Sequence, residues 1–71
     1  MDENLKRLFK AWWHERQSLI EDGWEFVNTC RDHTFRDAML KRNGHEIILQ
    51  LNYDELNVQL WRDGKLRKTI T

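Results

Sequence analysis

The stretch AMLKRNGHEIIL, residues 38–49, decides the fold, because an Asn43-Gly44 dipeptide stands between two runs of apolar residues. Asn-Gly is the preferred pair for a two-residue turn between antiparallel strands. A turn of this length fixes which residues lie opposite one another. The predicted pairs are Arg42 with His45, Leu40 with Ile47, Met39 with Ile48, and Ala38 with Leu49.

Residues 34–42 also carry a signal for another conformation. Thr34-Phe-Arg-Asp37 has the spacing of a capping box that would open a short helix. The Asn-Gly pair that follows favours a strand instead. We predict a strand for this segment, with the short helix as the alternative.

Further segments alternate between apolar and polar residues, which is the two-residue period of a strand. These segments are residues 24–30, 45–53 and 56–62. Asp63-Gly64 predicts a second two-residue turn and a final strand. If residues 52–55 form the loop between the middle strands, the apolar positions share one face. The pairs across that loop would be Leu51 with Leu56, Leu49 with Val58, and Ile47 with Leu60.

Before Gly23, apolar residues recur with the 3.6-residue period of an α-helix. They are Leu5, Leu8, Phe9, Trp12, Leu19 and Ile20. Asp2 and Glu3 suit the positive end of a helix over about residues 2–22, and Gly23 suits its left-handed stop.

Together these elements predict an α+β fold, with one N-terminal amphipathic helix packed on a four- to five-stranded antiparallel β-meander over about residues 24–70. We expect a single domain spanning residues 1–71. A chain this short buries only about 60% of the surface that its unfolded form exposes, so its stability is marginal. Its one cysteine, Cys30, forms no internal disulfide, and assembly is the expected source of added stability.

Composition and charge argue against several classes of function. Twelve Lys and Arg residues balance twelve Asp and Glu residues, so no overall field draws the chain to nucleic acid or membrane. No apolar run approaches the ~18 residues of a membrane span. Residues 1–4 lack the pattern of a secretory signal peptide. We expect a cytoplasmic protein with no membrane contact.

The chain has four tryptophans, more than a core of this size needs. Trp12 and Trp24 are predicted to enter the core between helix and sheet, and Trp13 to lie at its margin. The alternative for Trp13 is a platform on which a base or a partner's side chain stacks. Arg16 falls within the apolar stripe of the helix, where we expect its stem to pack and its guanidinium either to reach solvent or to stack on a tryptophan ring. The alternative is a buried partner for a carboxylate, or an arginine that binds a ligand. Trp61 alternates with the apolar positions of its strand and so points away from the helix.

The face of the sheet away from the helix is the predicted functional surface. A two-residue turn at Asp63-Gly64 puts Leu66 opposite Trp61, and no predicted element covers this face. The predicted partner-binding residues are Trp61, Met39, Ile48, Leu66, Ile70 and Arg62, and Arg36 and Lys68 would join Arg62 at the rim. The alternative is an ordinary cross-strand pair of Trp61 with Leu66. A turn one residue longer would place Leu66 and Ile70 in the core.

Contiguous apolar patches with a central tryptophan are typical of protein interfaces. We therefore predict a non-enzymatic protein-interaction module, without cofactors, that forms a homodimer or binds a protein partner. Its small size would suit an accessory or inhibitor protein of a bacterium or phage.

A nucleic-acid-binding domain is the alternative function, which we favour less. Basic residues around the last hairpin would form an edge beside Trp61, namely Arg62, Lys65, Arg67 and Lys68 together with Lys41 and Arg42. Charged residues also protect edge strands against aggregation, which is the simpler explanation.

Cysteine and histidine offer little chemistry in this chain. Cys30-x-x-His33 resembles half of a zinc site, and His45 would add a third ligand, but structural zinc needs four. On a strand, Cys30 and His33 would point to opposite faces, so a nucleophile and base pair would need a turn between them. We predict no metal site.

Residues 19–24, Leu-Ile-Glu-Asp-Gly-Trp, are followed nine residues later by His33. This pattern resembles the helix-to-strand junction and histidine of HicA-type messenger-RNA-cleaving toxins. The resemblance implies a helix, three strands and a helix, with His33 as the catalytic residue. Arg31-Asp32 stands where that family has Gly-Ser, and the C-terminal third has the pattern of a hairpin in place of a helix.

Overall fold

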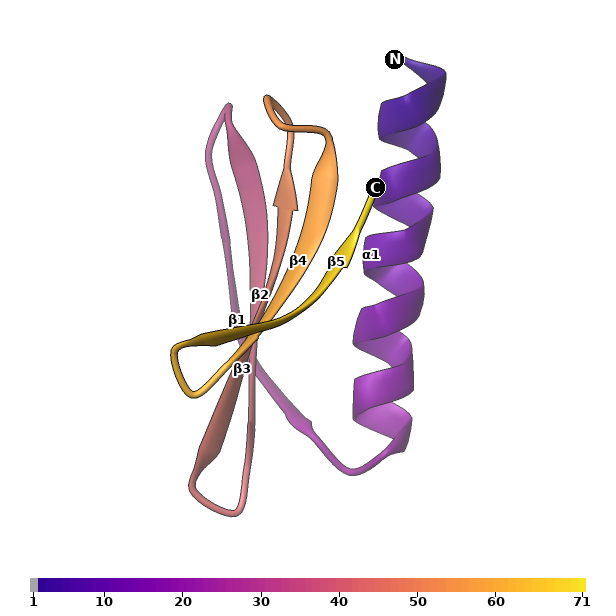
Figure 1. The fold of residues 1–71 in the computed structure, drawn as a ribbon. Helices are drawn as coiled ribbons and strands as arrows, with labels where there is room; N and C mark the ends of the chain where they lie inside the picture. Colours follow the sequence, from indigo (N-terminus) through magenta and orange to yellow (C-terminus); the bar gives the residue numbers. More distant parts are fainter. Residues whose placement is uncertain (1) are drawn as a thin grey trace.

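The computed structural model describes residues 2–71 and has one helix followed by five strands (Figure 1). The elements are α1 (Glu3–Glu21), β1 (Glu25–Arg31), β2 (Phe35–Arg42), β3 (His45–Asn52), β4 (Asn57–Arg62) and β5 (Lys65–Ile70). The strands are antiparallel and lie in the order β1-β2-β3-β4-β5, so each pairs with its neighbour in the sequence. The predicted α+β fold, one helix on an antiparallel meander, is confirmed with five strands.

Both ends of α1 follow from local sequence signals. The carboxylate of Asp2 caps the first turn by accepting a hydrogen bond from a backbone N–H. At the other end Gly23 has a φ of 98°, and its N–H donates to the carbonyl of Ile20. The N–H of Trp24 donates to the carbonyl of Leu19 at 2.9 Å. These two bonds form a Schellman motif, so glycine ends the helix as predicted.

The hairpin of β2 and β3 has the predicted register. Asn43 and Gly44 both have positive φ, 50° and 82°, as a type I′ turn requires. The observed pairs include Arg42 with His45, Leu40 with Ile47, Met39 with Ile48, and Ala38 with Leu49. The strand predicted for residues 34–42 is confirmed as β2, and the short helix is not formed.

The predicted register between β3 and β4 is wrong by two residues. The loop covers residues 53–56 instead of 52–55, and Leu56 belongs to it with a left-handed φ of 53°. The observed pairs include Leu51 with Val58, Leu49 with Leu60, and Ile47 with Arg62. A shift of two residues returns each side chain to the same face, so Val58 and Leu60 still face the helix, whereas Leu56 is exposed in the loop.

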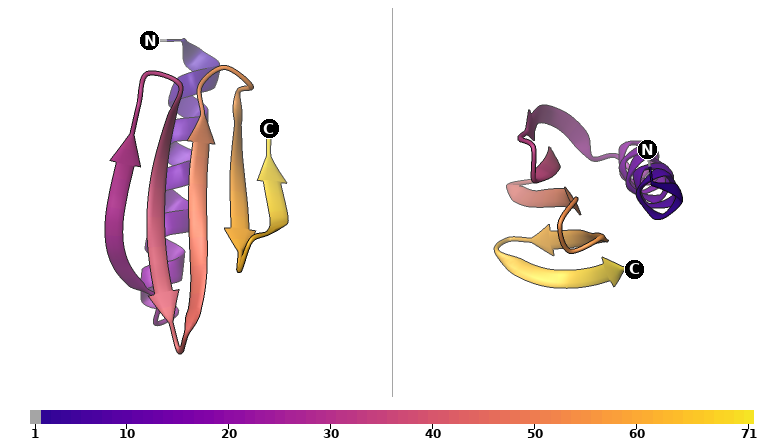
Figure 2. Two further views of the ribbon diagram at one scale, coloured as in Figure 1. Left: turned by 90° about the vertical axis from the view of Figure 1, so that its left-hand side faces the viewer. Right: turned by 90° about the horizontal axis from the view of Figure 1, so that it is seen from above.

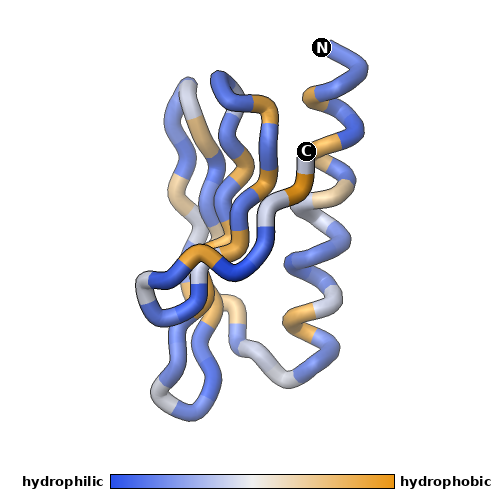
Figure 3. Tube along the Cα trace, viewed as in Figure 1, coloured by the Kyte–Doolittle hydropathy of each residue, from blue (hydrophilic) through white to orange (hydrophobic). Residues whose placement is uncertain are grey.

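The core lies between α1 and one face of the sheet (Figure 2). Apolar residues are interspersed with polar ones along the strands (Figure 3). Trp12 is 3% exposed, and its Nε1 donates to the carbonyl oxygen of Leu49 at 2.9 Å. The buried residues are Leu8, Trp12, Trp24, Ala38, Leu40, Ile47, Leu49, Leu51 and Val58. Both tryptophans predicted for the core are therefore in it.

Candidate functional site

The outer face, the side of the sheet away from α1, carries a row of four apolar side chains. Pairing across β2 to β5 aligns them in the order Met39, Ile48, Trp61 and Leu66. Leu66 is 46% exposed and the other three are half-buried. No helix or strand of residues 2–71 lies over this face (Figure 2). The predicted placement of these four residues is confirmed.

The predicted placement of Ile70 on the outer face is wrong. The register of β4 and β5 shifts between Leu60 and Trp61, which pair with Lys68 and Leu66 respectively. An extra residue in β5 therefore forms a β-bulge, and the alternation of faces reverses beyond it. Ile70 consequently packs against the core on the helix side.

The predicted placement of Arg62 at the rim of the outer face is also wrong. Arg62 lies opposite Ile47, which is buried against the helix, so both side chains share the helix side. The guanidinium of Arg62 lies 5.3 Å from the centroid of the Trp24 ring. It therefore covers the edge of the core in place of flanking Trp61.

Arg36 and Lys68 likewise face the helix, contrary to their predicted place at the rim. Arg36 lies opposite the buried Leu51, and its guanidinium is 4.9 Å from the centroid of the Phe9 ring. Lys68 Nζ lies 2.5 Å from Glu15 Oε1 on the helix. The predicted basic edge beside Trp61 therefore loses Arg62 and Lys68 to the opposite side of the sheet.

A hollow of about 540 Å³ lies on the outer face between the two glycine turns. Its lining residues are Gly44, Glu46, Ile48, Gln50, Trp61, Asp63 and Gly64. Asp63 accepts hydrogen bonds from the backbone N–H of Glu46 at 3.0 Å and pairs with His45 at 2.8 Å. Both hydrogen bonds lower the pKa of Asp63, and the bond from the Glu46 backbone has the larger effect. The hollow thus combines an indole and an aliphatic side chain with two carboxylates, and no basic residue lines it.

A third carboxylate on the outer face belongs to Asp37, which lies opposite Gln50. Burial raises the pKa of Asp37, and a hydrogen bond from Gln50 partly opposes this effect. Oδ1 of Asp37 has no hydrogen-bond partner among residues 2–71. Lys41, opposite Glu46, is the basic residue that the pairing places beside these acids. The middle of the outer face is therefore apolar and acidic.

Aromatic rings and arginines meet on the helix side at the β1 edge of the sheet. The guanidinium of Arg16 lies between two rings, 4.7 Å from the centroid of Trp13 and 4.3 Å from that of Phe26. The predicted stacking of Arg16 on a tryptophan is confirmed. A groove of about 240 Å³, here called the arginine groove, is lined by Trp12, Trp13, Arg16, Phe26, Thr29, Arg31 and Arg36.

Sequence reasoning did not predict the arginine groove, although one signal was present. Arg36 stands two positions before Ala38, a predicted core-facing residue of the same strand. Strict alternation therefore puts Arg36 on the helix side. Arg31 joins it because the two residues are directly opposed across β1 and β2.

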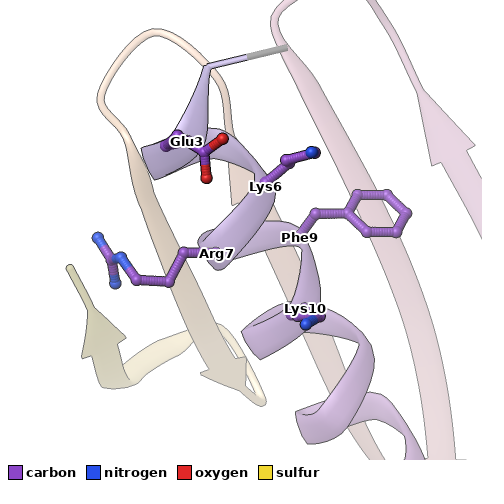
Figure 4. A pocket seen from close by; sticks show the side chains of 5 residues that line it. All are labelled: Glu3, Lys6, Arg7, Phe9 and Lys10. Carbon is purple, nitrogen blue, oxygen red and sulfur yellow. The ribbon is translucent and has the colours of Figure 1, made fainter.

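Another hollow, of about 620 Å³, lies along the first turns of α1 (Figure 4). Its lining residues are Glu3, Lys6, Arg7, Phe9 and Lys10, all from one helix. Their side chains point in different directions, and Arg7 donates to the carbonyl of Thr71. In a binding site several polar groups converge on one point, and the polar groups of the described residues that line this hollow do not.

The cysteine and histidines are dispersed. Cys30 is exposed on β1, and the side chain of His33 is 89% exposed in the turn after it. No group of three or more potential metal ligands occurs in residues 2–71. Residues 57–70 form strands β4 and β5, so the terminal helix that the HicA resemblance implies is not formed.

Within residues 2–71, no helix is both long enough and apolar enough to cross a membrane. Comparisons with protein-family models, with curated proteins and with solved structures found no match for the chain.

Proposed function

We propose that the protein is a non-enzymatic interaction module that binds a protein segment through the outer face of its sheet. The observation that carries this proposal is the row of Met39, Ile48, Trp61 and Leu66 on a face with no covering element in residues 2–71. A half-buried tryptophan at the centre of an apolar patch is typical of interface hot spots.

The acids beside this row favour a partner segment with basic as well as apolar side chains. Glu46 and Asp63 line the same hollow as Trp61, and the hydrogen bonds to Asp63 keep it ionised. An indole face attracts a cation, and the two carboxylates add charge complementarity. A partner segment with a lysine or arginine next to an apolar residue would complement the indole and both carboxylates.

The same charges oppose a homodimer formed through this face. Two copies packed outer face to outer face would bring two acidic surfaces together, each with Glu46, Asp63 and Asp37 and with Lys41 as the balancing charge. Like charges across an interface are unfavourable, so the proposal commits to a foreign protein segment over a second copy.

A random peptide library displayed on phage tests the proposal. We expect the selected peptides to combine Lys or Arg with aliphatic or aromatic residues. Trp61→Ala should weaken a selected peptide roughly 30-fold or more, the scale of a hot-spot residue. Glu46→Gln, which changes the charge with little change of shape, should weaken it less but raise its tolerance to salt.

Leu56→Ala serves as the control, because Leu56 is an exposed apolar residue in the β3–β4 loop, outside the row. This variant should bind within about twofold of the wild type. Circular dichroism confirms that each variant is folded. Selected peptides that bind Trp61→Ala as tightly as wild type would contradict the proposal, as would a dimer in light scattering that Trp61→Ala dissociates.

A further inference from the structure

The arginine groove brings the positive charges of three arginine side chains close together. Arg31 and Arg36 lie directly opposite each other on β1 and β2, and both line the groove with Arg16. Like charges directly opposed across strands are destabilising. No carboxylate in residues 2–71 forms an ion pair with any of the three guanidinium groups. The groove is therefore a site of unbalanced positive charge.

Two of these guanidinium groups are held in place by aromatic rings. Arg16 lies between Trp13 and Phe26, and Arg36 lies 4.9 Å from the Phe9 centroid. Stacking uses the flat face of a guanidinium and leaves the N–H donors at its edge available. The side chain of Arg16 donates to Gln17 through one nitrogen, and its other donors remain. Oriented guanidinium forks of this kind bind phosphate oxygens in pairs.

We infer that the arginine groove binds the phosphate backbone of single-stranded nucleic acid. Trp13 is 46% exposed and Phe26 36% exposed, so each presents ring surface on which a base can stack. Positive charge interleaved with aromatic rings is the usual composition of single-strand binding surfaces. This combination favours a nucleic acid over a phosphorylated peptide, which needs no stacking surface.

The size and position of the groove suit a chain that passes through it. At about 240 Å³ it is smaller than the ~300–1,000 Å³ of pockets that enclose a whole small molecule, so its size suits a short piece of a longer chain. Three of its lining residues, Phe26, Thr29 and Arg31, belong to β1, an edge strand whose residues are all exposed. The groove lies on the helix side, so this inference does not rest on the proposed function of the outer face.

Fluorescence anisotropy with an end-labelled single-stranded oligonucleotide tests the inference. Arg31→Gln and Arg36→Gln should each weaken binding at least about fivefold at low salt. Each should also lower the slope of log affinity against log salt by roughly 0.7, the value for one lost phosphate contact on a single strand. Trp13→Ala should weaken binding roughly fivefold or more while leaving that slope unchanged, because it removes stacking and no charge.

Arg62→Gln is the matched control. It removes the same charge from another helix-side arginine that stacks on a tryptophan, but Arg62 does not line the groove. This variant should bind within about twofold of wild type. An equal loss for Arg62→Gln and Arg31→Gln would overturn the inference, because it would mean that only total charge matters. It is also overturned if the oligonucleotide does not bind, or if a phosphopeptide of equal charge binds more tightly.

Thermal melting in the presence of inorganic pyrophosphate gives an independent readout. Pyrophosphate should raise the melting temperature of the wild type and of Arg62→Gln, at an ionic strength matched with chloride. Without an added anion, Arg31→Gln should melt at or above the wild-type temperature, since it removes the opposed charge. A lower melting temperature for Arg31→Gln would mean that Arg31 stabilises the fold, which overturns the inference.

Discussion

Replacing Trp12 by phenylalanine tests how the core is held together. Trp12 is 3% exposed and donates a hydrogen bond from Nε1 to the carbonyl oxygen of Leu49, in the central strand. The variant keeps an aromatic ring beside Phe9, whose centroid lies 5.9 Å away, but removes both the donor and part of the ring. Trp13→Phe makes the same chemical change at a neighbouring, 46% exposed position.

The expected loss of stability for Trp12→Phe is about 2 kcal/mol. The hydrogen bond contributes about 1 kcal/mol net. The smaller ring buries roughly 40 Å² less apolar surface, which at about 25 cal/mol per Å² is a further 1 kcal/mol. A chain of this length has a free energy of unfolding of about 4–11 kcal/mol, so this loss is a large part of the whole. For Trp13→Phe we expect a change within about 0.5 kcal/mol.

Urea unfolding followed by circular dichroism measures both variants against wild type. For Trp12→Phe the midpoint should fall with the slope m unchanged, and the melting temperature should drop by roughly 8–16 °C. A loss below about 0.5 kcal/mol for Trp12→Phe would refute the reasoning, because neither the hydrogen bond nor the burial would then contribute. Equal losses for Trp12→Phe and Trp13→Phe would refute the assignment of core and margin.

Two further perturbations follow from the outer face and its turns. Because burial raises the folded-state pKa of Asp37, the folded protein binds a proton more tightly than the unfolded chain, so stability falls as pH rises from the ordinary value of 3.8 through the raised pKa. Asp37→Asn should therefore lose less stability than wild type across this window in urea unfolding at stepped pH, and a steeper loss would contradict the assignment. Gly44→Ala should cost about 1–2 kcal/mol in the same assay, since Gly44 has a φ of 82° and an added Cβ meets no atom within 4 Å. An unchanged midpoint for Gly44→Ala would show that the turn tolerates an L side chain.

The parts of the fold that depend on local chemistry were predictable. Asn43-Gly44 permits positive φ at both turn positions, and this fixed the register of β2 and β3 residue by residue. Gly23 ended the helix for the same reason. The outer-face placement of Trp61 followed from alternation along one short strand next to such a turn.

The errors occur where the backbone departs from regular geometry without a sequence signal. Leu56 adopts a left-handed φ that is unusual for a leucine, and this moved the β3–β4 loop by one position. The bulge in β5 adds one residue, which sent Ile70 to the helix side. The error for Arg62 has another cause. Its charge favoured a position at the rim of the outer face, whereas alternation along β4 places it on the helix side.

The strand order has a consequence for the speed of folding. Every strand pairs with its neighbour in the sequence, so each loop that must close during sheet formation is short. The docking of α1 onto the sheet, mainly onto β3 and β4, joins distant segments. Proteins in which local pairings dominate have a low contact order and fold fast for their size. We expect this chain to refold in milliseconds or less, with the hairpin around Asn43-Gly44 forming early and the helix docking last.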